Sequence, residues 1–151
     1  MATCTRFSQE ELEQVLDTFT AACRAAGLKV THQRIEIYRQ LVILPDHPSA
    51  ETLYKRLLPT LPTISLDTVY RTLTTLEQHG LVSRIQTAES QARFEAVFTH
   101  HHHLICSRCK QVIDFTWPEV DAVTLPEDLA QWGQIDSKTI VMYGICNTCT
   151  P

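Results

Sequence analysis

The sequence lacks any apolar run that approaches the roughly 20 residues needed to span a bilayer. Its opening residues, 1–14, contain no apolar core of the kind that export signals carry. With 20% charged and 44% hydrophobic residues, it also lacks the composition of a disordered chain. We therefore expect a soluble cytoplasmic protein with no membrane partner.

Motifs of the common enzyme classes are also missing. The chain contains no G-x-S-x-G, no P-loop and no H-E-x-x-H. We expect neither an enzyme nor a receptor for a small organic ligand. Two alternatives stay open at this point. A metal-dependent hydrolase needs only His, Glu and Asp around a metal with one open coordination position. A metal-storage or delivery protein needs only the metal ligands.

The chain has no excess of positive charge, because 13 Lys and Arg stand against 17 Asp and Glu. The acidity lies in the second half. Residues 1–87 carry nine basic and nine acidic residues, whereas residues 88–151 carry four and eight. Phosphate contacts are made patch by patch, so a neutral first half needs only a local basic face to bind DNA.

Apolar residues at helical spacing predict four helices in the first half, over residues 7–26, 32–42, 49–58 and 66–79. Gly27 and Gly80 follow the first and the last of them, as expected at helix ends. Alternating residues over 81–86 and 92–97, joined by a polar turn, predict a β-hairpin. Helices followed by a hairpin are typical of a winged helix-turn-helix, which we place at residues 1–97 with the fourth helix as the recognition helix.

The second half predicts a mixture of strands and helix. Short β-prone segments at 104–105, 112–115 and 139–145 surround a segment with a helical pattern at 118–132. We expect a small α/β dimerisation domain over residues 98–151, so that the whole chain is of the α+β class.

Four cysteines form two C-x-x-C pairs, Cys106 with Cys109 and Cys146 with Cys149. Each such turn presents two sulfurs to one point, and four thiolates are the ligand set of a closed structural Zn²⁺ site. In a chain without an export signal, paired C-x-x-C indicates metal before disulfide. Two disulfides or four reduced thiols are the alternative. We predict one structural zinc held by these four residues, and we assign no role to the two remaining cysteines.

Four consecutive histidines precede the first cysteine pair. On an extended segment alternate side chains share a face, so His101 and His103 should point one way and His100 and His102 the other. One pair can then converge on a metal with a carboxylate, a donor set that suits Fe²⁺, Mn²⁺ or Zn²⁺ and exchanges metal more readily than four thiolates. The alternative is a solvated polar run at a domain junction.

Further motifs occur in order along the chain, namely AGLKVT at 26–31 with Arg34, HPSAETLY at 47–54, SLDTVYRTL at 65–73, GLV at 80–82 and RFE at 93–95. Together with the histidine run and the first cysteine pair, they resemble the ferric uptake regulator (Fur) superfamily over nearly the whole chain. The resemblance implies a dimeric, metal-activated transcriptional repressor that binds double-stranded operator DNA.

By the same resemblance, a regulatory Fe²⁺ or Mn²⁺ lies between the two domains. Its implied ligands are His47, Glu95, His101, His103 and Asp114. Ligands from both halves would fix the angle between the domains, so metal binding could select the dimer whose recognition helices match the operator.

Several positions bear on what is sensed. Zinc sensors of this superfamily usually place a Cys near the end of the wing, and this chain has none there. Peroxide-sensing members, the PerR group, typically carry Asp at the position of Asp114, which favours a peroxide-stress regulator. Glu95 is more typical of iron sensors, so a ferric uptake regulator is the alternative. Some iron sensors have a further metal site, but Lys138 replaces one of its histidines here, so we do not expect that site to be complete at His100 and His102.

The recognition helix has an apolar face made of Leu66, Val69, Leu73 and Leu76. Its outward face offers Thr68, Tyr70 and Arg71. By resemblance, Tyr70 and Arg71 contact DNA, the ring on a thymine methyl and the guanidinium on a phosphate or a guanine. A half-buried core aromatic is the alternative for Tyr70. Lys29, before the second helix, is expected to enter a minor groove.

Overall fold

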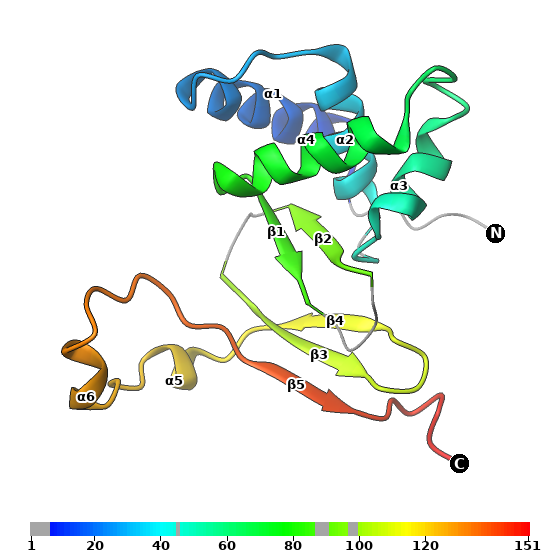
Figure 1. Ribbon diagram of the computed structural model, residues 1–151. Coiled ribbons are helices and arrows are strands. Elements are labelled where there is room, and N and C mark those ends of the chain that lie inside the picture. Colours follow the sequence, from blue (N-terminus) through cyan, green and yellow to red (C-terminus); the bar gives the residue numbers. More distant parts are fainter. Residues whose placement is uncertain (1–6, 45, 87–90, 97–99) are drawn as a thin grey trace. The chain divides into compact units, whose positions relative to one another are not determined.

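The structure is a computed structural model that describes residues 7–44, 46–86, 91–96 and 100–151 (Figure 1). The chain divides into two compact units, Met1–Phe98 and Thr99–Pro151. The domain boundary expected after residue 97 falls among residues outside the described part, as does Cys4. Among the described residues, no helix is both long and apolar enough to cross a membrane.

The first unit begins with four helices, α1 (Gln9–Ala25), α2 (His32–Ile43), α3 (Ala50–Leu57) and α4 (Leu66–Gln78). Each helix is capped at its start by a side-chain hydroxyl, which accepts a hydrogen bond from the backbone N–H three residues later. The capping residues are Ser8, Thr31, Ser49 and Ser65. Such caps satisfy donors that a helix start otherwise leaves unpaired. Gly27 follows α1 with a φ of 75°. Leu28 N donates to Cys23 O and Gly27 N to Arg24 O, which closes the helix with a Schellman motif. The four expected helices are confirmed, with every end within two residues of its expected position.

A short antiparallel hairpin follows, formed by β1 (Val82–Ile85) and β2 (Arg93–Ala96). Its register places Ser83 opposite Glu95 and Arg84 opposite Phe94. The polar turn expected at 87–90 lies outside the described residues. Helices followed by a two-stranded wing are the arrangement expected of a winged helix-turn-helix.

One apolar core joins the helices and the hairpin. Every element contributes to it, with Phe19, Ile37, Leu53, Leu73, Leu76, Val82 and Phe94 among its buried members. In α4 the expected apolar face is buried except for Leu66, which is half-buried. In α2, Ile37 and Val42 take fully buried positions and Ile35 is only half-buried. Burial differs along α2 because positions 37, 38, 41 and 42 form the helical stripe that faces the core, and position 35 lies outside it.

The second unit is built on a three-stranded sheet in which β3 (His102–Cys106) lies between β4 (Val112–Phe115) and β5 (Val141–Gly144). β4 runs antiparallel to β3, and β5 runs parallel to it. Because β4 returns the chain to the edge of the sheet where β3 begins, the segment between β4 and β5 passes β3 at that edge before β5 starts. The expected strand at 139–145 is confirmed in its central part.

The single helix expected over 118–132 is wrong. That segment contains two one-turn helices, α5 (Pro118–Asp121) and α6 (Glu127–Ala130). Pro126 stands in the middle of the expected helix. It has no backbone N–H, and its ring disfavours the helical conformation of Leu125, so the helix cannot continue through it.

Candidate metal centres and DNA-binding face

Four cysteine sulfurs of the second unit lie together where β3 and β5 end. All four Sγ atoms are within 4.8 Å of one another, and those of Cys109 and Cys146 are 3.7 Å apart. Because β3 and β5 are parallel, the C-x-x-C turns that follow them leave the sheet at the same edge. This topology brings the pairs together although 36 residues separate Cys109 from Cys146 in the sequence.

The sulfur geometry fits zinc. The four thiols are not bonded to one another, and 3.7 Å far exceeds a disulfide bond of about 2.05 Å. Zn–S bonds of about 2.3 Å in a tetrahedron would set the sulfurs about 3.8 Å apart. The backbone N–H groups of Cys146 and Cys109 donate to Cys106 Sγ at 3.4 and 3.5 Å.

The pKa values of two of these thiols are shifted in opposite directions. The N–H donors of Cys146 and Cys109 lower the pKa of Cys106 to about 5. A hydrogen bond to Cys146 raises the pKa of Cys149 to about 12. Hydrogen bonds among neighbouring sulfurs thus keep a proton within the cluster. A bound divalent cation would displace that proton, because it deprotonates its thiol ligands. The cluster is consistent with a structural zinc site.

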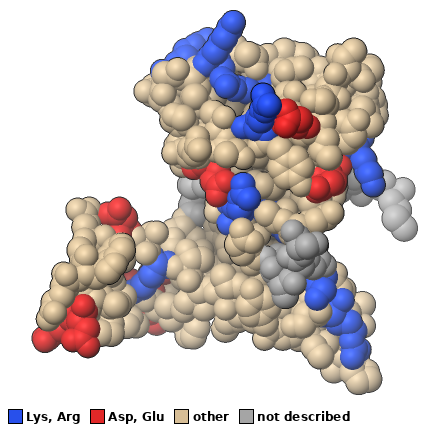
Figure 2. Space-filling view, in the orientation of Figure 1, with Lys and Arg blue, Asp and Glu red and all other residues tan. Residues whose placement is uncertain are grey.

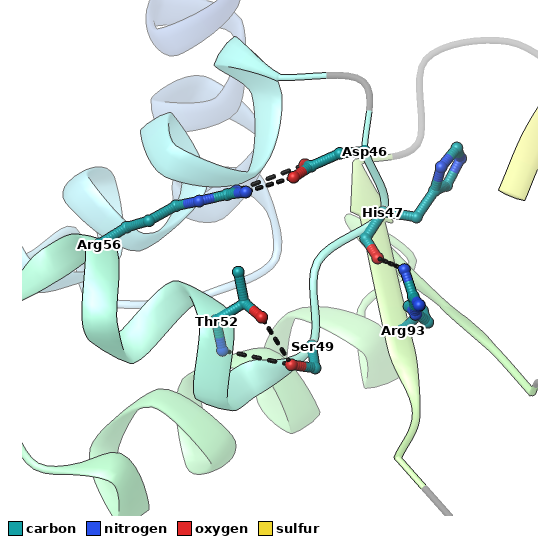
Figure 3. Close-up of polar contacts among 6 residues, drawn as sticks. All are labelled: Asp46, His47, Ser49, Thr52, Arg56 and Arg93. Atoms are coloured by element: carbon teal, nitrogen blue, oxygen red, sulfur yellow. Dashed lines mark hydrogen bonds and ion pairs between the residues drawn. The ribbon is translucent and has the colours of Figure 1, made fainter. Parts of the chain in front are cut away.

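His47 lies in the loop before α3, buried and with a φ of 48°. This left-handed conformation is uncommon outside glycine, so the surroundings must hold it. Figure 3 shows the contacts on either side of it. Asp46 forms an ion pair with Arg56 of α3, and the His47 carbonyl accepts a hydrogen bond from Arg93 Nη1 of β2 at 3.4 Å. Ser49 then caps α3 through Thr52 N at 3.2 Å.

Glu95 of β2 meets the imidazole of His47 within the same unit. His47 Nε2 and Glu95 Oε2 are 3.0 Å apart, and the two side chains are only 4% and 11% exposed. Phe94 N donates to Pro48 O at 3.0 Å, which ties the loop to β2 and keeps the two residues side by side. An imidazole and a carboxylate held this way form a mixed N/O donor pair for a divalent cation.

The second unit holds a further N/O donor group. His103 of β3 lies opposite Asp114 of β4 in register. The Nε2 atoms of His103 and His101 are each 3.6 Å from Asp114 Oδ1. The rings of His101 and His103 are 4.9 Å apart, so the expected sharing of a face by alternate histidines is confirmed. The five residues implied by the resemblance therefore form a pair in the first unit and a trio in the second.

The other two histidines share a carboxylate that the sequence did not single out. His100 Nε2 and His102 Nε2 lie 3.1 and 3.0 Å from Asp121 Oδ1 on α5. Nothing in the spacing signals this contact, because it depends on how α5, in the segment between β4 and β5, lies against β3. Lys138 donates to Val123 O at 2.7 Å and lines, with His100 and Asp121, an open cavity of about 520 Å³. Two imidazoles and one carboxylate are present there, and a lysine lines the same cavity.

The residues predicted to contact DNA lie at the surface of the first unit. Tyr70 of α4 is 37% exposed. Its hydroxyl donates to Glu51 Oε1 on α3. Arg71 is exposed and pairs with Asp67, which lies in the first turn of α4, at 2.9 Å. An ion pair this exposed contributes little, so the guanidinium remains available to a phosphate. Thr68 is half-buried on the same helix.

Basic side chains also gather at one end of the first unit. Figure 2 shows Lys and Arg over the region of the α1–α2 loop that Figure 1 places at the top of the view. Lys29 belongs to this loop and is exposed, and its carbonyl accepts a hydrogen bond from Arg34. Because the first half of the chain has no net charge, DNA binding requires a local basic face, and this region provides one.

Comparisons with known proteins agree on one family. Residues 25–143 match the ferric uptake regulator family. The peroxide-responsive repressor PerR of Staphylococcus epidermidis is 33% identical over 143 residues, 93% of this chain and 93% of that protein. The structure of the Helicobacter pylori ferric uptake regulator Fur, described as having three functional metal binding sites, matches with a TM-score of 0.72 at 28% identity, over 91% of this chain and 93% of that one. The ferric uptake regulator of Pseudomonas aeruginosa with manganese gives 0.70 at 30% identity, over 85% and 97%. This chain belongs to the ferric uptake regulator family.

Proposed function

We propose that this chain is a metal-dependent transcriptional repressor that binds operator DNA as a homodimer and responds to peroxide. The observation that carries the proposal is the presence of an N/O donor group in each of the two units. His47 and Glu95 form a buried pair in the first, and His101, His103 and Asp114 form a trio in the second. Two relatives support the proposal: the Staphylococcus epidermidis protein is a peroxide-responsive repressor, and the Pseudomonas aeruginosa regulator was solved with manganese.

Joining the two donor sets on one ion would fix the angle between the units. Imidazole and carboxylate donors suit Fe²⁺ or Mn²⁺. The set contains no thiolate, so it holds metal less tightly than the four cysteines and can report on metal supply. The first-unit pair is already positioned by the contacts of Asp46 and Arg93, so little ordering remains to be done on binding. Occupancy then selects one arrangement of the DNA-binding units.

A second copy of the chain would cover the outer sheet face of the second unit. Leu104 of β3 lies between Ile113 of β4 and Met142 of β5, and the three side chains are 39%, 44% and 38% exposed. A contiguous apolar row of this kind marks an interaction surface. A dimer formed there would present two α4 helices to two half-sites, with Thr68, Tyr70 and Arg71 toward the major groove and Lys29 toward a minor groove.

Asp114 favours peroxide as the signal. Bound Fe²⁺ would supply the reducing electrons for peroxide, and the imidazoles of His47 and His101 would be the groups nearest to the oxidant formed. Oxidation of His47 or His101 would remove a ligand and loosen the link between the units. Glu95 favours a second candidate, a ferric uptake regulator, in which DNA binding follows iron supply without oxidation of a ligand.

A gel-shift titration with Fe²⁺, Mn²⁺ and Zn²⁺, repeated after low peroxide, tests the proposal. Fe²⁺ and Mn²⁺ should switch DNA binding on, and peroxide should abolish only the iron-dependent binding. Mass spectrometry of that iron form should find one added oxygen, about 16 Da, on His47 or His101. Arg71→Ala serves as the control that takes up metal but loses DNA affinity.

Three other results have distinct meanings. Iron-dependent binding with neither histidine modified identifies the iron-uptake regulator. Metal-independent DNA binding contradicts the repressor mechanism. Hydrolysis of a substrate by the metal-loaded chain, without DNA binding, would support the hydrolase.

A further inference from the structure

A hydrogen bond between α3 and α4 involves Tyr70, one of the residues proposed to contact DNA. Tyr70 Oη, on α4, donates to Glu51 Oε1, in the first turn of α3. We propose that Glu51 positions the Tyr70 ring for base reading and so determines the sequence specificity of the protein. The inference rests on the proposed DNA-binding function and adds to it a residue that itself need not touch DNA.

Both ends of this bond are fixed by the core. Leu53 and Leu57 anchor α3, and Val69 and Leu73 anchor α4, all with 0% exposure. The Tyr70 ring, by contrast, projects to the surface, where an aromatic side chain without a partner would move among rotamers. Holding its hydroxyl on α3 removes that freedom before DNA arrives. The entropy of ordering the ring is then not lost on binding, which is the effect of preorganisation.

Glu51 is itself held in place. It lies within the turn that Ser49 caps, where the helix N-terminus favours a carboxylate. Its Oε2 atom is buried, so the carboxylate is not a loose surface group. The hydrogen bond lowers the pKa of Glu51 and raises that of Tyr70. Near neutral pH the acid is therefore ionised and the phenol protonated, as the bond requires.

The charge of Glu51 has a separate effect, which is on the affinity for DNA of any sequence. Non-specific DNA binding depends almost entirely on phosphate contacts, which a carboxylate beside the recognition helix opposes. The charge therefore weakens binding to every sequence alike, and the preference between sequences comes from the positioned ring. Orientation and charge predict different results for different substitutions, so the two contributions can be separated.

The test uses the metal-loaded full chain and two duplexes. One is enriched from random-sequence DNA by the wild-type protein, and the other is its scrambled counterpart. The ratio of the two dissociation constants is measured by fluorescence anisotropy for Glu51→Ala, Glu51→Gln, Tyr70→Phe and the double variant Glu51→Ala/Tyr70→Phe. Asp17→Ala, which removes an exposed carboxylate from α1, is the matched charge control.

We expect Glu51→Ala and Tyr70→Phe each to lower the ratio by on the order of 10-fold, the size of one good base contact. The double variant should lose no more than either single variant, because both remove the same bond. Glu51→Gln retains an oxygen acceptor, so it should keep most of the ratio while binding both duplexes more tightly. Asp17→Ala should leave the ratio unchanged.

Two results would overturn the inference. Wild-type specificity in Glu51→Ala would show that the ring is positioned without it. Additive losses in the double variant would show that Glu51 acts through helix packing and not through the Tyr70 hydroxyl. If the wild-type protein enriches no sequence in any metal, the proposed function fails first, and the two failures are thereby distinguished.

Discussion

The two units of this protein differ in where they place their apolar side chains. Among the described residues, twelve large hydrophobic side chains are exposed, and only Tyr70 belongs to the first unit. The second unit buries little beyond Ile105, Cys106, Val112 and two histidines of β3. The first unit thus has a core of its own, whereas the second leaves most of its apolar surface unburied.

The difference shows that the second unit must be stabilised by other means. It comprises residues 99–151, and a chain segment of about 50 residues seldom buries enough apolar surface to fold on that basis alone. A metal site and oligomerisation are the usual supplements. The unit offers a cysteine cluster at one edge of its sheet and an apolar row on one face. Four predictions test this contrast between the units.

The largest effect should come from the zinc site. Cys106→Ser removes a ligand, and structural zinc contributes on the order of 10 kcal/mol or more in small modules. We expect zinc to be lost and the second unit to unfold, while α1–α4 stay protected in segment-resolved hydrogen exchange. Cys23→Ala, a buried thiol of the first unit, should retain zinc. A zinc-free variant whose β3–β5 amides remain protected would show that the sheet does not need the metal.

Features that depend on nearby residues could be predicted from the sequence. The four helices of the first unit follow from hydroxyl caps and apolar stripes, and the zinc ligands follow from two turns of fixed geometry. The break at Pro126 was also present in the sequence, but the helical pattern over 118–132 concealed it. The contacts of Asp121 with the histidines and of Glu51 with Tyr70 could not be predicted, because each depends on how two separate elements pack.

The core of the first unit should give the next largest effect. Leu73 is fully buried in α4, so Leu73→Ala should cost about 2–5 kcal/mol through lost contacts and a cavity. Leu129→Ala in the second unit is the matched control, since that side chain is 41% exposed. It should change stability by less than about 0.5 kcal/mol. Urea titrations followed by hydrogen exchange would report each unit separately, and equal losses in both variants would contradict the contrast.

A smaller effect is expected at the apolar row of the second unit. Leu104→Ala removes the centre of that row, and truncating a central interface residue costs about 1–2 kcal/mol. The dimer dissociation constant should rise on the order of 10-fold, without unfolding the sheet. Sedimentation equilibrium measures it, with Leu129→Ala again as the control. If Leu104→Ala dimerises like the wild type, the second copy binds elsewhere.

The smallest effect should come from helix capping, in which the units also differ. Ser65 Oγ accepts Thr68 N at 3.1 Å at the start of α4, whereas α5 and α6 start without a side-chain cap. Ser65→Ala leaves that N–H unpaired and should destabilise the first unit by about 1 kcal/mol. Ser65→Asp restores an acceptor and should recover the stability, although its charge near phosphates should still weaken DNA binding. The two measurements, thermal unfolding and operator affinity, thus separate the cap from the charge. If Ser65→Ala melts like the wild type, α4 is held by its buried face alone, and the caps of the first unit add nothing to the contrast.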